Sequence, residues 1–187
     1  MALKPEDELV DVLTLVPDAV LDVRYATADN FTGRALYTRA AVFLRRGTAR
    51  RLARAAELLR GRGLRLRLFD GYRPASVHEQ MWQARPDPRL VADPARGSKH
   101  SRGCAVDAGL CGKDGEPLPM PSEFDDFEKA AAPWPHAAPW ALRNLELLRG
   151  AMKAAGFVTI DSEWWHFVDP EGEGAPALDL PFPTGRN

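Results

Sequence analysis

Apolar and polar residues follow two different periods along this chain, and the periods separate strands from helices. In 64–68, leucines alternate with arginines, which predicts a half-buried strand. The stretch 46–62 instead carries its leucines and alanines at helical spacing, which predicts an amphipathic helix packed on a sheet. A short alternation at 21–25 predicts a further strand, and turn residues follow it.

Two proline-rich stretches, 85–97 and 111–139, show neither period. We expect them to be loops, and the longer one can help to wall a site. The remaining elements are expected as a helix at 75–84, a buried strand at 103–110, a helix from Pro139 to a glycine cap at Gly156, and paired strands at 157–160 and 164–168.

Length and charge limit the classes of protein that this chain can belong to. With 187 residues, 45% of them hydrophobic, it has the size of one ordinary domain. A net charge of -1 gives no basic field, so we expect no nucleic-acid partner and a small molecule instead. The sequence has neither a signal peptide nor an apolar run long enough for a membrane span, which favours a cytoplasmic protein without membrane contact.

Two short segments carry the chemistry that stands out. The first segment, 98–107, contains His100 and Asp107. The second segment, 163–166, begins with Glu163 and ends with His166. Two imidazoles and one carboxylate are ligands that zinc prefers in catalytic sites, where water completes the tetrahedron. We expect one zinc ion per chain on these three ligands, with Glu163 as the general base for the zinc-bound water. Arg73, at the end of a strand, is expected to stabilise the charge that develops on the carbonyl oxygen.

The spacing of these residues makes two demands on the backbone. An extended chain would hold His100 and Asp107 ~23 Å apart, so the chain must reverse between them, and Gly103 is the obvious place. Glu163 and His166 have odd spacing and would face opposite sides of a regular strand. We therefore expect an irregularity at Glu163, or a strand that begins only after it.

Other interpretations exist for each residue taken alone. Arg73 could simply pair with Asp70, Glu163 could be an exposed charge, and a single histidine is more often structural than a ligand. The basic stretch 98–103 could bind phosphate, although it lacks the glycine spacing of a P-loop. Cobalt or iron could also occupy such a metal site.

The motifs resemble those of the zinc D-alanyl-D-alanine dipeptidases of the VanX type, within the D,D-carboxypeptidase superfamily. The resemblance rests on five segments in the same order along the chain: 25–33 (YATADNFTG), 70–74 (DGYRP), 98–107 (SKHSRGCAVD), 120–125 and 163–166 (EWWH). It implies a single α+β domain with a hedgehog-like zinc fold and a central, mostly antiparallel sheet flanked by helices. Within residues 1–187, we expect 1–20 and 170–187 to be peripheral.

The resemblance also implies the activity and the substrate contacts. It assigns zinc to His100, Asp107 and His166, and implies hydrolysis of D-Ala-D-Ala, a peptidoglycan precursor fragment, to two D-alanines. Competing hypotheses are a D,D-carboxypeptidase or murein peptidase acting on longer cell-wall peptides, and a non-catalytic zinc module that binds peptides. The residues that it places around the dipeptide are Tyr25 and Asp125 at the free amine, and Ser98 and Tyr37 near the carboxylate.

Overall fold

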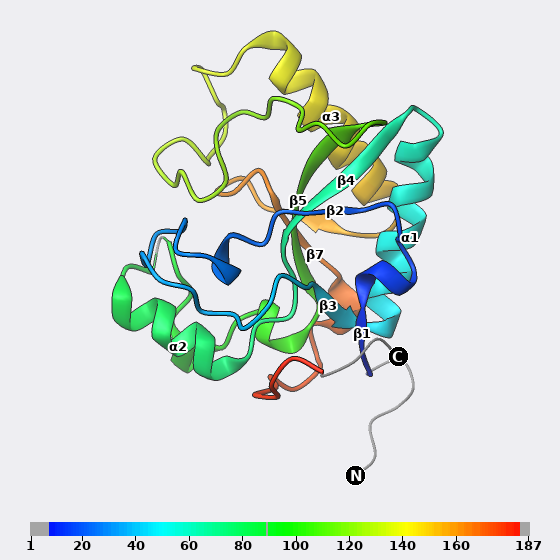
Figure 1. The fold of residues 1–187 in the computed structure, drawn as a ribbon. Coiled ribbons are helices and arrows are strands. Elements are labelled where there is room, and N and C mark those ends of the chain that lie inside the picture. Colours follow the sequence, from blue (N-terminus) through cyan, green and yellow to red (C-terminus); the bar gives the residue numbers. More distant parts are fainter. Residues whose placement is uncertain (1–7, 89, 184–187) are drawn as a thin grey trace.

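A mixed sheet forms the centre of the protein in the computed structural model, which describes residues 8–88 and 90–183 (Figure 1). Within these residues the sheet has five strands in the order β2-β4-β5-β7-β6. β2 runs parallel to β4, and the other neighbours are antiparallel, which confirms the expected mostly antiparallel sheet. The strands are β2 (Val20–Leu21), β4 (Leu64–Asp70), β5 (Ala105–Gly112), β6 (Val158–Thr159) and β7 (His166–Val168).

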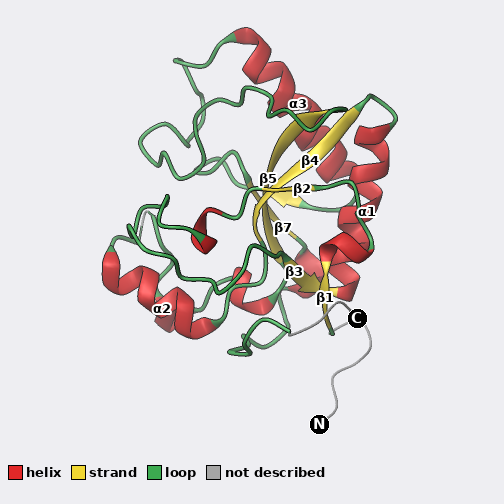
Figure 2. Cartoon of the chain, viewed as in Figure 1, coloured by secondary structure: helices red, strands yellow, loops and turns green. Residues whose placement is uncertain are grey.

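Helices α1 (Arg46–Arg60) and α3 (Pro139–Ala154) pack against each other and cover one face of this sheet. Helix α2 (Ala75–Ala84) and most of the long loops gather on the other side (Figure 2). Short 3-10 turns occur at Val12–Thr14, Arg24–Ala26, Pro94–Arg96, His100–Arg102 and Pro170–Gly172.

The long elements lie close to their predicted ranges, and the short elements differ more from theirs. Helices α1, α2 and α3 and strands β4 and β5 lie where the sequence predicts them, within two residues at most ends. The strand expected at 21–25 is different, because β2 ends at Leu21 and a 3-10 turn begins at Arg24. A small antiparallel sheet, formed by β1 (Leu9–Asp11) and β3 (Phe43–Arg45), was not expected from the sequence.

The N-terminal segment 8–20 is not peripheral, whereas every residue of 170–183 is exposed or only half-buried, in keeping with a tail at the surface. Val12 and Val16 are buried in the main core, since β1 pairs with β3 and brings this segment against α1. Near the other end, the hydroxyl of Tyr72 donates to the carbonyl of Leu180, and Phe182 packs on the Phe43 ring. The expectation for 1–7 and 184–187 lies outside the described residues.

Among the described residues, no helix combines the length and the apolar character needed to cross a bilayer. The apolar faces of the helices are instead used against the sheet, where Leu52, Leu59 and Leu148 are fully buried. These contacts leave the other face of the sheet, with α2 and the loops, to hold polar residues.

Gly71 is closely surrounded by other atoms. A Cβ atom at this position would lie 2.7 Å from both the Phe43 carbonyl oxygen and a Val42 methyl group. We expect Gly71→Ala to lower the free energy of unfolding by about 1–3 kcal/mol, since β3 must shift to make room. Gly150→Ala is the matched control: it lies in α3 with nothing within 4 Å of the added carbon. It should raise stability by up to about 1 kcal/mol through helix propensity. Equal effects of both changes in denaturant unfolding would contradict this account.

Candidate metal centre and its pocket

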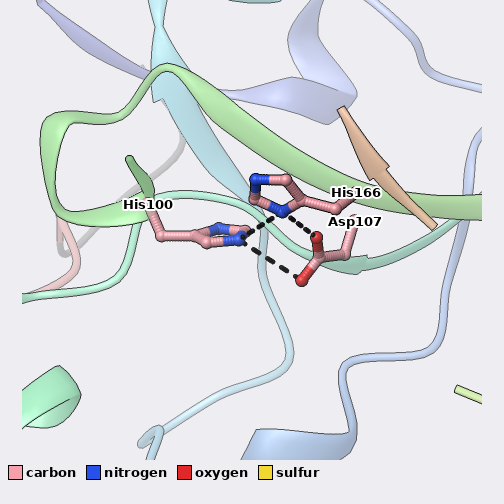
Figure 3. Close-up of side chains that lie close together, drawn as sticks. All are labelled: His100, Asp107 and His166. Atoms are coloured by element: carbon pink, nitrogen blue, oxygen red, sulfur yellow. Dashed lines mark hydrogen bonds and ion pairs between the residues drawn. The ribbon is translucent and has the colours of Figure 1, made fainter. Parts of the chain in front are cut away.

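Side chains from a 3-10 turn and two strands lie close together, as Figure 3 shows: His100, Asp107 and His166. Their ligand atoms all lie within 4.8 Å of one another. The Nε2 atom of His100 is 3.2 Å from Nδ1 of His166, and the Asp107 carboxylate oxygens lie 2.9 Å from His166 and 3.4 Å from His100. Among the described residues this is the only such cluster of histidine, cysteine and carboxylate groups. The structure thus brings together all three predicted ligands.

The register of three neighbouring strands places the carboxylates and one imidazole side by side. Asp107 on β5 pairs directly with His166 on β7, and on its other side it pairs with Asp70, the last residue of β4. Side chains in direct register point to the same face of a sheet, about 4.5–5.5 Å apart at Cβ. Asp70 therefore lies next to the cluster, although sequence reasoning gave it only a structural role.

His100 reaches the cluster from a 3-10 turn that ends at Gly103, just before β5 begins. Gly103 has a φ of 68°, the left-handed conformation that favours glycine, so the chain reverses where the sequence predicts. The Nδ1–H of His100 donates to the carbonyl of Gly71 at 2.7 Å. That hydrogen bond fixes the tautomer and leaves the lone pair of Nε2 facing the other two ligand atoms.

Burial and charge oppose each other at this cluster. Burial alone would raise the pKa of Asp107, but the charges and hydrogen bonds of His100 and His166 outweigh it, so the net pKa is lowered. Burial alone would lower the pKa of His100, but the Asp107 carboxylate raises it overall. The cluster therefore combines an ionised carboxylate with two imidazole nitrogens that face the same point. This set of donor atoms fits a divalent transition metal.

Glu163 lies just before β7 begins, in the irregular stretch that the odd spacing predicted. It lines the same cavity as the three cluster residues and is not itself in the cluster. Burial raises the pKa of its carboxyl group above the usual value, partly offset by the charge of His166. A carboxylate with a raised pKa beside a metal site is placed to take up a proton.

Arg73 also lines this cavity and is itself buried. Its Nε and Nη2 atoms donate to one oxygen of Asp70 at 3.0 and 2.6 Å, so the alternative pairing considered from the sequence does occur. The guanidinium carbon also lies 5.4 Å from the centre of the Tyr25 ring, within range of a cation–π interaction. These contacts hold the cation at the cavity wall without removing it from the cavity.

The cavity has a volume of about 300 Å³, a size suited to a small molecule. Tyr25 and Ser98 are among its lining residues. Asp125 is not among the lining residues, but its carboxylate accepts a hydrogen bond of 2.8 Å from the Tyr25 hydroxyl. Tyr37 differs from expectation: it lies behind Arg73, and its hydroxyl donates to Asp70 at 2.7 Å.

Two polar residues next to Arg73 were not identified as functional candidates from the sequence. Asp70 accepts from Tyr37 and Arg73 and is almost fully buried. His78, on the first turns of α2, is also buried and lines the cavity. The only signal for His78 was its place on the helix that follows Arg73, and that signal is weak without the fold.

Comparisons with known proteins point to one group. A family model described as "D-ala-D-ala dipeptidase" matches residues 5–183. The chain is 41% identical over 172 residues to the D-alanyl-D-alanine dipeptidase of Escherichia coli K12, covering 91% of this chain and 89% of that protein. It is 34% identical to the D-alanyl-D-alanine dipeptidase of Enterococcus faecium, covering 79% of this chain and 84% of the relative. For the Streptomyces coelicolor D-alanyl-D-alanine dipeptidase, identity is 32%, with coverage of 87% and 91%.

The geometry of the cluster predicts how metal binding changes when single residues are replaced. We expect a divalent metal at about 100 times its Kd to stabilise the protein by about 2.7 kcal/mol, seen as a higher Tm. His166→Ala should abolish this shift, since a ligand is lost. Glu163→Gln should keep it, because Glu163 lies outside the cluster. His136→Ala is the matched control, since His136 contacts the Pro121 carbonyl instead. Loss of the shift in Glu163→Gln would mean that Glu163 is a ligand.

Proposed function

Because this chain belongs to the D-ala-D-ala dipeptidase family of peptidases, we propose that it hydrolyses D-Ala-D-Ala to two molecules of D-alanine, with zinc as its metal. The main support for this proposal is that one cavity is lined by the three-residue cluster, by the Glu163 carboxylate and by the buried Arg73 cation. Hydrolysis of an amide needs a metal or acid at the carbonyl, a base for water and a stabiliser of negative charge. The cavity supplies a residue for each of these needs.

Zinc would be held by Nε2 of His100, Nδ1 of His166 and the Asp107 carboxylate. Three protein ligands of this kind are typical of catalytic zinc sites, which keep a further position open. When bound, zinc supplies Lewis acidity toward water and toward the scissile carbonyl. The Gly71 carbonyl supports this arrangement by holding the His100 ring in the required tautomer.

Glu163 acts as the general base in this proposal. Its carboxylate takes the proton of the attacking water and passes it to the amine that leaves. Burial favours the protonated form and raises the pKa of Glu163, which makes the carboxylate a stronger base than an exposed glutamate. The same carboxyl group can therefore accept the proton in one step and donate it in the next.

Arg73 stabilises the negative charge that grows on the carbonyl oxygen. Burial alone would lower the pKa of Arg73, but the Asp70 carboxylate, together with smaller contributions from Tyr37, Tyr25 and Asp107, outweighs it, so the net pKa is raised and the guanidinium stays charged in the cavity. A preorganised donor of this type is worth about 2.7–4 kcal/mol in the transition state. Asp70 fixes one edge of the guanidinium and leaves each terminal nitrogen with a further hydrogen to donate.

The remaining polar residues recognise the two ends of the dipeptide. Asp125 and the Tyr25 hydroxyl form one polar pair, to which we assign the free ammonium group of the substrate. Ser98 lines the cavity on the His100 side and is assigned to the carboxylate end. Tyr37 contacts Asp70, so we assign it to support of the Asp70–Arg73 pair in place of direct substrate contact.

The substrate assignment is tested by measuring release of free amine by the zinc-loaded protein from three peptides. We expect cleavage of D-Ala-D-Ala, because a cavity of about 300 Å³ accommodates a dipeptide with both charged ends. L-Ala-L-Ala should be cleaved poorly, and so should N-acylated D-Ala-D-Ala, which lacks the ammonium group that Asp125 attracts. A preference for the acylated peptide would favour a D,D-carboxypeptidase. Bound zinc with no cleavage of any peptide would favour a binding module.

The Asp125 carboxyl group predicts how activity depends on pH. Burial raises its pKa to about 7, and the hydrogen bond from Tyr25 only partly offsets this. A group with a raised pKa loses its negative charge as the pH falls through that value, so attraction for the substrate ammonium is lost below about pH 7.

We therefore expect KM for D-Ala-D-Ala to rise as the pH falls through 7. In Asp125→Asn, KM should be high on both sides of that pH, and this pH dependence should disappear. The measurement is KM as a function of pH in both proteins. An identical pH profile of KM in the variant would contradict the role of Asp125.

A further inference from the structure

His78 makes two polar contacts that connect Arg73 to the loop on the cavity wall. Its Nδ1 atom lies 3.3 Å from Nη1 of Arg73, and its Nε2 atom lies 2.8 Å from the carbonyl oxygen of Ala92. The ring is 3% exposed. Ala92 itself lines the cavity, so one buried imidazole joins the Arg73 cation to the loop segment that contains Ala92.

The two partners fix the protonation state of the ring. A carbonyl oxygen can only accept, so Nε2 of His78 carries the hydrogen and donates it to Ala92. The guanidinium of Arg73 can only donate, so Nδ1 must present its lone pair. His78 is therefore neutral and accepts a hydrogen bond from Arg73.

The electrostatic surroundings agree with this state. Burial and the positive charge of Arg73 lower the pKa of His78 to about 4, and the charge of His100 acts in the same direction. The Ala92 carbonyl opposes the shift only in part.

Arg73 needs such a contact because Asp70 holds only one edge of its guanidinium. Both hydrogen bonds to Asp70 come from Nε and Nη2 and end on the same oxygen. A pair of bonds that share one acceptor atom fixes the plane less firmly than bonds to two acceptors, and the Tyr25 ring contacts the cation without binding a particular nitrogen. The contact at Nη1 involves a different nitrogen and a different element, α2, and adds a second point of attachment.

We propose that His78 is a positioning residue, which orients the Arg73 guanidinium toward the reacting carbonyl by accepting a hydrogen bond from Nη1. The kinetic consequence rests on the proposed dipeptidase function, whereas the hydrogen bond itself does not. Because Arg73 is assigned to the transition state, loss of His78 should lower kcat more than it raises KM.

Two amide variants separate the contacts of His78. In asparagine the side-chain oxygen is as many bonds from Cβ as Nδ1 of histidine, so His78→Asn keeps an acceptor for Arg73 and loses the bond to Ala92. In glutamine the terminal nitrogen corresponds to Nε2, so His78→Gln keeps the bond to Ala92, and its amide oxygen lies one bond farther from Cβ than Nδ1, away from the acceptor position that Arg73 uses. His78→Leu removes both and serves as the reference for complete loss.

We expect His78→Gln and His78→Leu to lower kcat for D-Ala-D-Ala by about 10- to 100-fold, the range typical for loss of an outer-shell partner. His78→Asn should keep kcat close to the wild-type value. The reverse order, with Gln active and Asn as slow as Leu, would overturn the proposal, because the bond to Ala92 would then be the important one. Unchanged kcat in all three variants would also overturn it.

A double-mutant cycle shows whether His78 acts through Arg73. In an Arg73→Ala background, His78→Leu should cause no further loss of kcat, because the group that His78 orients is absent. A further loss as large as that in the wild-type background would indicate a structural role and contradict the proposal.

A measurement without turnover separates this inference from the proposed function. Nitrogen NMR of the histidine rings in the zinc-loaded protein at pH 7 should show His78 neutral, with the hydrogen on Nε2, and His78→Gln assigns the signal by its disappearance. A charged ring, or one with the hydrogen on Nδ1, would overturn the positioning role whatever the substrate is. Wild-type protein that fails to cleave D-Ala-D-Ala would instead contradict the proposed function.

Discussion

The register between β4, β5 and β7 is the constraint on which the rest of the site depends. It sets Asp70, Asp107 and His166 in one row on the open face of the sheet. A slip of one residue would turn the moved side chain to the face covered by α1 and α3 and would remove the cluster. The core under this row is made of large buried side chains, among them Phe167 on β7, so the packing that fixes the register also positions the chemistry.

The same row brings the buried carboxylates of Asp70 and Asp107 next to each other, and neighbouring groups compensate their negative charge. Asp70 accepts hydrogen bonds from Tyr37, Gly71 and Arg73, which satisfies it within the protein. Asp107 instead contacts the imidazoles of His100 and His166 and lines the cavity, so it is the carboxylate that can bind a cation. Buried charges are costly unless they are paired, and this division explains why one carboxylate supports the arginine while its neighbour is available to the metal.

Much of this could be predicted from the sequence, because strong periods and short-range chemistry are local signals. The helices, β4, β5 and the reversal at Gly103 followed from such signals, and the ligands stood out by residue type and spacing. The place of Tyr37 behind Arg73 and the contact between His78 and Arg73 depend on which elements pack together, which no local pattern contains. The N-terminal segment 8–20 was misjudged for the same reason, since its apolar residues pack against partners that are distant in sequence.

The most direct test of the account is an anomalous difference map at the zinc absorption edge from crystals of the zinc-loaded protein. The account predicts one strong peak with Nε2 of His100, Nδ1 of His166 and the Asp107 carboxylate about 2.0–2.2 Å from it, and with the Glu163 carboxylate outside this ligand set. A map with no peak between these residues, or with Glu163 coordinating the metal in place of Asp107, would contradict it.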